Sequence, residues 1–346
     1  MGRRYDNFTE DDYRPRPNRK GSRPRTKERP DYSDVPTAMV TAVDRGRYRV
    51  VVHNDDGQAP VDGPTVTCVR SSRLRRRSIV PGDRVRVVGD TSGADGTMAR
   101  IVEILDRRTL LRRSADDTDP TERVLVANAD QLVIVTAAAD PEPSWGLIDR
   151  ALVAAFDAGM EPLIAVTKLD LAPLDAIGDY YAAAGVRVVA CGFDTTGRPQ
   201  IGQLLPELTG RLSVLVGHSG VGKSTLMNAI IPAADRAIGD VNAVTGRGRH
   251  TSSSALCLPL PDSGWLIDTP GVRSFGLAHV DIDSVLTAFD ELVEATADCP
   301  RGCTHLDDAP DCALDAWVAE GKAGEAGPQR LASLRRLLGG LQQPAY

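Results

Sequence analysis

The chain has 346 residues, with 42% hydrophobic and 25% charged residues and a formal net charge of −6. These values are typical of a soluble protein with two or three domains. No apolar run approaches the length of a membrane span, and no apolar stretch follows the Arg-rich N-terminus as in a secretory signal. The composition therefore argues against a membrane or secreted protein and predicts a cytoplasmic one.

The charge is unevenly distributed along the chain. Residues 1–113 contain 25 Arg and Lys against 16 Asp and Glu, whereas residues 114–346 contain 16 against 31. A basic front joined to an acidic body predicts that the front binds a polyanion.

The basic front consists of two segments of different character. Residues 1–35 are rich in Arg, Pro and Asp without hydrophobic periodicity, which predicts a disordered basic tail. Residues 36–113 contain four or five short β-like runs, separated by turn clusters such as Asn54–Gly57 and Pro81–Asp83. An all-β barrel of the oligonucleotide-binding (OB) type suits strands of this number and length. The polar residues 114–122 are expected to be a linker.

From residue 123 to residue 277, strand-like runs alternate with helix-like ones. Leu132–Val135, Leu163–Val166 and Leu212–Val216 are continuously apolar, as buried strands are, and apolar residues at helical spacing follow the first. This alternation predicts an α/β domain with helices on both faces of its sheet. The last segment, residues 278–346, is expected to be mostly helical.

The strongest motif is a P-loop, which reads Gly217-His218-Ser219-Gly220-Val221-Gly222-Lys223-Ser224-Thr225. It follows a predicted strand and opens a helical pattern, which is the context that this motif requires. Its glycines let backbone N–H groups point at phosphate oxygens, and the helix N-terminus adds positive potential. We expect Lys223 to neutralise the β- and γ-phosphates and the Ser224 hydroxyl to ligate Mg²⁺.

A second motif, Asp268-Thr269-Pro270-Gly271, follows the predicted strand Trp265–Ile267. At a strand end downstream of a P-loop, the Asp268 carboxylate can hold Mg²⁺ through water. The N–H of Gly271 can then face the γ-phosphate. Alone this tetrapeptide is a common turn, but its position after the P-loop makes it a nucleotide motif.

A third motif, Thr167-Lys168-Leu169-Asp170, ends the strand Leu163–Val166. The Asp170 carboxylate can accept hydrogen bonds from both N1–H and N2–H₂ of guanine, a donor pair that adenine lacks. The stem of Lys168 can lie along the base. By itself the motif reads as a solvated strand end, but together with the P-loop it predicts binding of GTP rather than ATP.

The C-terminal segment contains four metal-ligating residues within a short stretch: Cys299, Cys303, His305 and Cys312. Three thiolates and one imidazole complete the tetrahedral coordination of a structural Zn²⁺ and leave no open position for catalysis. In a reducing compartment such a cluster indicates metal rather than a disulfide. Unrelated reduced cysteines are the alternative.

One predicted loop of the barrel is rich in Arg, with Arg70, Arg73, Arg75, Arg76 and Arg77. Such a run is often plain solvated surface, but beside an Arg-rich tail it predicts a patch that binds phosphates. Tyr48 is the only aromatic residue between Pro36 and Arg113. The barrel is therefore expected to recognise the backbone or shape of RNA rather than to stack on its bases.

The motifs occur in a rotated order, with base recognition first, then the P-loop, then Asp-Thr-Pro-Gly. With the OB-like front and the Cys/His tail, this order resembles the ribosome small subunit-dependent GTPase A family, over roughly residues 37–315. The resemblance implies a circularly permuted GTPase that binds the small ribosomal subunit and its rRNA. It also implies subunit-stimulated hydrolysis of GTP to GDP and phosphate, with Mg²⁺, late in subunit maturation.

The resemblance also implies roles for residues outside these patterns. Residues 246–251 resemble the first switch of the family, with Thr251 sensing Mg²⁺ and the γ-phosphate and His250 in catalysis. Val189–Cys191 stands where the family has a loop behind the guanine. No Gln follows Gly271, so intrinsic hydrolysis is expected to be slow, with His250 as the nearest substitute. A solvated or RNA-contacting histidine is the alternative.

Two other functions are weighed against this one. A GTP-gated RNA-binding module, in which hydrolysis is incidental, fits the same motifs. A P-loop kinase is a third possibility, against which Asp170 and the Asp-Thr-Pro-Gly motif argue. The chain is expected to act as a monomer.

Overall fold

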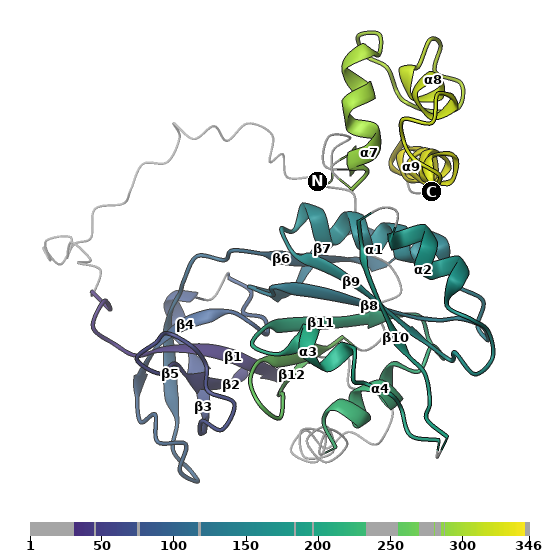
Figure 1. Ribbon diagram of the computed structural model, residues 1–346. Helices are drawn as coiled ribbons and strands as arrows, with labels where there is room; N and C mark the ends of the chain where they lie inside the picture. Colours follow the sequence, from purple (N-terminus) through teal and green to yellow (C-terminus); the bar gives the residue numbers. More distant parts are fainter. Residues whose placement is uncertain are drawn as a thin grey trace, which may run out of the picture. The chain divides into compact units, whose positions relative to one another are not determined.

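Figure 1 shows a computed structural model of the chain. It describes residues 31–342 except 45, 75–76, 117–118, 183–184, 196, 233–254, 270–279, 281–284 and 287. The chain divides into a unit of residues Met1–Asp34 and a compact unit of residues Val35–Tyr346, and the description below concerns the second. No helix in the described ranges is long and apolar enough to cross a membrane.

Five strands near the N-terminus close into a barrel, as the sequence predicts. They are β1 (Thr37–Asp44), β2 (Arg47–Val52), β3 (Thr65–Arg70), β4 (Arg84–Gly89) and β5 (Ala99–Ile104). They pair in the order β1-β2-β3-β5-β4, and β4 pairs back with β1. Alternate residues such as Val50, Val66 and Ile101 fill the interior. The result is an OB-like barrel.

The central sheet is built mainly from parallel strands. In spatial order these are β10 (Arg187–Cys191), β9 (Glu161–Thr167), β8 (Gln131–Ala137), β11 (Leu212–Gly217) and β13 (Trp265–Asp268). β12 (Leu256–Pro259) pairs antiparallel with β13 and meets β1 of the barrel at Leu256 and Ala42. The barrel and the sheet are thus hydrogen-bonded into one continuous structure.

Helices cover both faces of this sheet (Figure 1), as the alternating pattern predicts. The helices α1 (Trp145–Asp157) and α2 (Asp175–Ala182) pack on the face that contains Leu132 and Ile134. The opposite face, with Val133 and Val135, is covered by α3 (Leu204–Leu208) and α4 (Lys223–Ile230). Because successive strand residues point to opposite faces, each buried strand serves both cores.

The polar segment 114–122, which the sequence analysis describes as a linker, lies instead in a hairpin. β6 (Leu110–Asp116) pairs with β7 (Asp119–Ala127), and the ladder runs from Leu110 opposite Ala127 to Asp116 opposite Asp119. Backbone pairing does not require apolar side chains, so polar composition hides the strands. At the base of the hairpin Leu111 and Val126 are buried in the core beneath α1.

An ion pair of the buried Asp83 fixes the turn that precedes β4. Asp83 is fully buried and accepts hydrogen bonds from Arg107 Nε and Nη2 at 2.7 and 2.8 Å. The preceding Gly82 has a φ of +83°, and a Cβ there would lie 2.0 Å from the Ala127 oxygen. The Pro81–Asp83 turn, predicted from sequence, therefore packs against the end of β7 at a distance that only glycine permits.

The C-terminal segment consists of short helices and one longer helix. They are α7 (Asp290–Val293), the 3₁₀ helix η3 (Glu294–Asp298), α8 (Ala313–Ala319) and α9 (Gly327–Gln342). Arg330 of α9 is buried, donates from Nε to Glu291 Oε1 at 2.6 Å and lies 4.1 Å from the centre of the Phe289 ring. These contacts join α9 to the region of α7.

A buried carboxylate attaches α9 to α1. Asp149 is 2% exposed and accepts hydrogen bonds from the Tyr181 hydroxyl and from Arg336 Nη2, both at 3.0 Å, and from the Ser333 hydroxyl. Burial, with the charge of Asp149 beside it, raises the pKa of Tyr181, so its hydroxyl stays protonated as a donor. Three elements, α1, α2 and α9, therefore share one acceptor.

We predict that Asp149→Ala destabilises the protein by about 2–3 kcal/mol, because it leaves two buried hydroxyls without their acceptor. Arg336→Ala should cost about 1 kcal/mol or less, since that side chain is 55% exposed. Urea unfolding of both variants measures the difference. Equal losses in the two variants would show that Asp149 does not anchor α9.

Candidate functional site

The P-loop connects β11 to α4 and runs close to the neighbouring strand. A Cβ at Gly217 would lie 2.4 Å from the Val135 carbonyl oxygen of β8, so only glycine fits there. Gly220 and Gly222 have φ of +84° and +89°, in the left-handed region that favours glycine. The loop thus turns sharply into the N-terminus of α4, where free N–H groups can bind an anion.

Lys223, the first residue of α4, faces Asp268, the last residue of β13. Lys223 Nζ lies 3.9 Å from Asp268 Oδ1, and the two side chains are 15% and 18% exposed. Burial raises the pKa of Asp268, while Lys223 and the Thr269 N–H oppose that shift. Within the described part of the chain, no donor hydrogen-bonds to the buried Oδ1. This oxygen is available to a water molecule bound to a cation.

The base motif touches the P-loop directly. Thr167 is buried, and its hydroxyl lies 2.5 Å from the Val221 carbonyl oxygen of the P-loop and 3.2 Å from that of Thr136. Lys168 has a φ of +55°, and its Nζ donates to the Asp140 carbonyl. Asp170 is exposed at the surface. Strand β9 and the P-loop are therefore held together by one threonine hydroxyl.

A small pocket lies between these two motifs. Its volume is about 90 Å³, and it is lined by Thr167, Lys168, Cys191, Phe193, Pro199, Gly222, Thr225 and Leu226. Burial raises the pKa of Cys191 to about 12, so this thiol stays neutral and serves as an apolar wall. Sequence reasoning singled out the residues of β9, β10 and the P-loop, but it missed Phe193 and Pro199, for which the sequence carries no signal.

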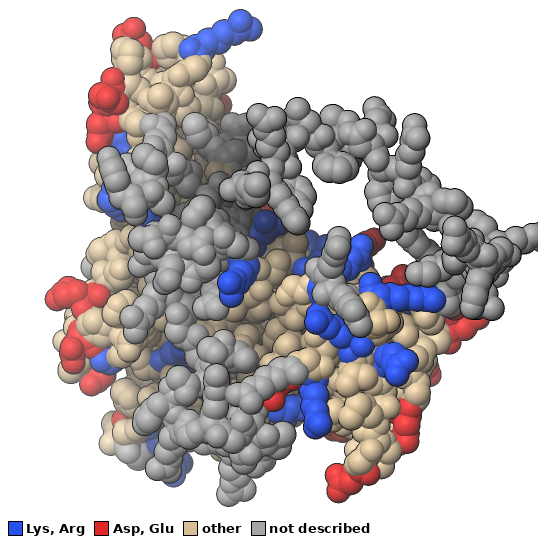
Figure 2. All heavy atoms as spheres, turned by 180° about the vertical axis from the view of Figure 1, so that it is seen from behind, with Lys and Arg blue, Asp and Glu red and all other residues tan. Residues whose placement is uncertain are grey.

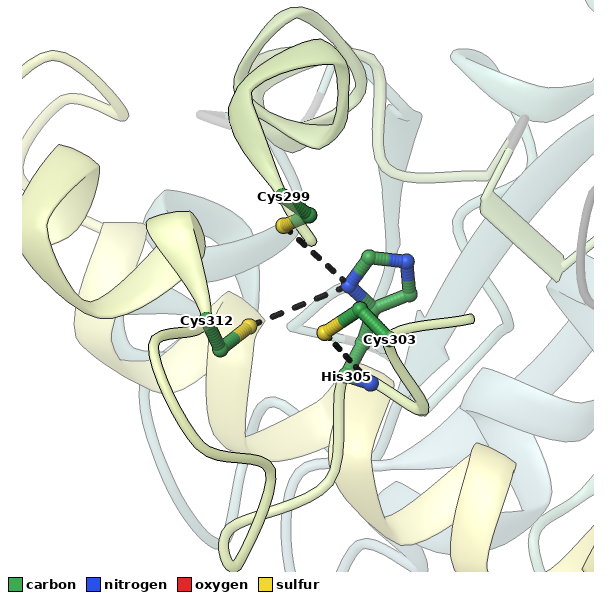
Figure 3. A group of neighbouring side chains, drawn as sticks. All are labelled: Cys299, Cys303, His305 and Cys312. Carbon is green, nitrogen blue, oxygen red and sulfur yellow. Dashed lines mark hydrogen bonds between the residues drawn. The ribbon is translucent and has the colours of Figure 1, made fainter. Parts of the chain in front are cut away.

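The four predicted metal ligands converge in the C-terminal segment (Figure 3). The ligand atoms of Cys299, Cys303, His305 and Cys312 all lie within 4.8 Å of one another. His305 Nδ1 is 3.6 Å from Cys299 Sγ and 3.8 Å from Cys312 Sγ. Tetrahedral coordination with ordinary Zn–S and Zn–N bond lengths separates such atoms by roughly 3.6 Å. The donor set fits Zn²⁺.

The surroundings of the cluster favour the ligating forms of its residues. The N–H groups of His305 and Ala313 donate to Cys303 Sγ and Cys299 Sγ, both at 3.4 Å, which suits thiolates. Burial and the nearby Arg335 lower the pKa of His305, so its imidazole is neutral, as metal binding requires. Arg335 Nε also donates to the His305 carbonyl and so fixes the backbone beside the ligand.

Residues 104–278 match the family described as RsgA GTPase. The protein named "Small ribosomal subunit biogenesis GTPase RsgA" from Pseudomonas aeruginosa PAO1 is 38% identical over 296 residues, which cover 82% of each chain. The chain belongs to the RsgA GTPase family. The RsgA of Azotobacter vinelandii, 37% identical over 307 residues, covers 86% of this chain and 84% of its own.

Two solved structures support the RsgA fold of this chain. YloQ, described as a circularly permuted GTPase, has a TM-score of 0.65 at 23% identity, covering 91% of this chain and 98% of its own. YjeQ from Thermotoga maritima has a TM-score of 0.63 at 23% identity, covering 88% and 98%. These likenesses show the fold alone. They confirm the permuted arrangement predicted from the order of the motifs.

The structure brings most of the predicted RsgA site residues together. The P-loop, Asp268 and the base motif meet at one edge of the sheet, and the four Cys and His residues form one cluster. Three predicted residues, His250, Thr251 and Gly271, lie outside the described residues. Asp170 does not line the pocket but lies at the surface beside Lys168.

We predict that the purified protein contains about one Zn²⁺ per chain and that Cys303→Ser lowers this content, because three ligands bind zinc more weakly than four. The matched control is Cys257→Ser, a buried cysteine outside the cluster, which should keep its zinc. Elemental analysis of the three proteins gives the result. Zinc-free wild-type protein, or undiminished zinc in Cys303→Ser, would contradict the assignment.

Proposed function

We propose that this protein is a GTPase of small ribosomal subunit biogenesis that hydrolyses GTP to GDP and phosphate when the subunit is bound. The observation that carries the proposal is the contact of Thr167 with Val221, which joins the base motif to the P-loop beside one pocket. Relatives named as small-subunit biogenesis GTPases, over most of the chain length, support the choice of partner.

The residues on the base side of the pocket support a preference for guanine. Its wall consists of side chains without free charge, apart from Lys168 at one side, and a flat base fits against such a wall. Asp170 follows two residues after Lys168 and is free at the surface to accept from N1–H and N2–H₂. Adenine would leave this carboxylate opposite an acceptor, at a cost that makes it a poor competitor.

The phosphate side accounts for hydrolysis. The N-terminus of α4 and Lys223 would bind the phosphates, and Ser224 and the Asp268 carboxylate would hold Mg²⁺. Bound Mg²⁺ neutralises charge that develops on the phosphate oxygens. We assign Thr251 and Gly271 to the γ-phosphate and His250 to positioning the attacking water. Because no Gln follows Gly271, we expect slow turnover without a partner.

The barrel supplies a surface for rRNA. Arg47, Arg70, Arg73, Arg77 and Arg100 are all exposed on it. Arg47 and Arg100 are the neighbours of Val69 on the two strands that flank β3, so their side chains lie on one face. Figure 2, seen from behind, shows several Lys and Arg side chains close together on one part of this face, with Asp and Glu mainly along its edges. Such a surface suits a phosphate backbone, and residues 36–113 act as the RNA-binding domain.

Turnover with and without small ribosomal subunits tests the proposal. We expect subunits to raise GTP hydrolysis by roughly 10²-fold, the scale of one positioned catalytic group. Nucleotide-dependent binding without stimulation would favour the RNA-binding module in which hydrolysis is incidental. Large subunits at equal concentration and equal salt are the control, since basic surfaces bind any RNA at low salt.

The guanine assignment has a separate test. Asp170→Asn should weaken GTP binding by about 100-fold or more and improve binding of XTP, whose C2 carbonyl can accept from the new amide. Calorimetric titration of both nucleotides against both proteins measures the exchange of preference. Unchanged GTP affinity in this variant would remove Asp170 from the site.

A further inference from the structure

Phe193 is an exposed aromatic residue at the mouth of the nucleotide pocket. Among the described residues, four large hydrophobic side chains are exposed: Met98, Leu171, Phe193 and Val293. Phe193, 42% exposed, is the aromatic member of this group and the one that lines the pocket. Covering an exposed aromatic ring with another apolar surface is favourable, because it removes apolar area from water.

A tight hairpin holds Phe193 in this place. Phe193 and Pro199 form a β-bridge, and Gln200 N donates to the Gly192 oxygen at 2.8 Å. At the tip, Asp194 Oδ1 accepts from Arg198 N at 2.9 Å, and Asp194 N donates to the Arg198 oxygen at 2.8 Å. The hairpin begins directly after β10, whose last residue, Cys191, is the inner wall of the pocket. The ring is thus positioned by backbone bonds rather than by chance packing.

The size of the pocket leaves part of a base uncovered. Its volume of about 90 Å³ is well below the roughly 300 Å³ at which ordinary ligand pockets begin. A purine inserted between Lys168 and the P-loop would therefore keep part of its surface at the mouth. That surface is flat and aromatic, and Phe193 is the aromatic side chain that lines the mouth.

We propose that Phe193 stacks against the guanine base and forms, with the stem of Lys168, the two sides of the base-binding slot. The inference rests on the proposed function, and it adds a residue to the site rather than a new reaction. Stacking acts on the face of the base, whereas Asp170 acts on its edge. The two residues therefore control different quantities: Phe193 controls affinity for any purine in the slot, and Asp170 controls the choice between purines.

Substitution of Phe193 tests this division. Phe193→Ala should weaken GDP and GTP binding by the same factor, about 10- to 100-fold, as expected for the loss of one stacked aromatic. The effect should be larger on the KM for GTP than on kcat, because the proposed contact is with the base and not with the phosphates. The control is Met98→Ala, a side chain of similar exposure, 46%, beside barrel strand β5, which should leave both affinities unchanged.

A tryptophan in the same position gives a direct signal of stacking. The F193W variant should bind GDP at least as tightly as wild type, and its fluorescence should change on GDP addition beyond the change of the wild-type protein. Because Phe193 is 42% exposed and belongs to none of the hydrophobic cores, both variants should change the thermal unfolding midpoint little. Zinc content serves as a second check of folding.

The results separate this inference from the proposed function. GDP binding by Phe193→Ala within twofold of wild type, while Asp170→Asn still loses GTP, would overturn the stacking role and leave the GTPase assignment intact. A wild-type protein that binds no guanine nucleotide would overturn both. A drop in turnover of Phe193→Ala at saturating GTP, with GDP affinity unchanged, would also refute stacking.

Discussion

The nucleotide site depends on one constraint, the shared carboxyl edge of five parallel strands. Gly217 ends β11, Asp268 ends β13, Thr167 ends β9 and Cys191 ends β10, so four motifs meet wherever they occur in the chain. Ligands bind outside the carboxyl ends of such strands. A circular permutation changes the connections but not this edge, which explains how base recognition can precede the P-loop in sequence.

Thr167 shows how a departure from the usual motif can be accommodated. Most GTPases have Asn at this position, where its amide can reach neighbouring groups. Here the shorter hydroxyl is buried and lies against the Val221 carbonyl oxygen, with Thr136 on its other side. The Thr167 hydroxyl alone therefore connects the base motif to the P-loop by a hydrogen bond. This contact fixes the position of the base motif relative to the P-loop.

The sequence predicted those features that depend on residues close together in the chain. The P-loop, the continuously apolar strands and the four-ligand cluster each depend on residues close in the chain, and the structure places them as expected. The hairpin of β6 and β7 was missed because its pairing is carried by backbone groups beneath polar side chains. Asp149 and Ser333 are 184 positions apart in the chain. A local hydrophobic pattern cannot predict a contact between residues so far apart. Phe193 was missed because it belongs to no motif, and only the fold shows that it lines the pocket.

One buried carboxylate, Asp149, attaches α9 to the helices beside the base motif. Asp149 lies in α1, and its partner Tyr181 lies in α2, the helix that follows the base motif. Through Ser333 and Arg336 the same carboxylate holds α9, which also contacts the zinc cluster through Arg335 and His305. The C-terminal helices are therefore attached to the guanine side of the sheet. Moving them away would leave buried hydroxyls and a buried carboxylate unpaired, a cost of several kcal/mol. The Asp149 contacts therefore join α9, which also carries Arg335 beside His305, to the two helices on one face of the sheet.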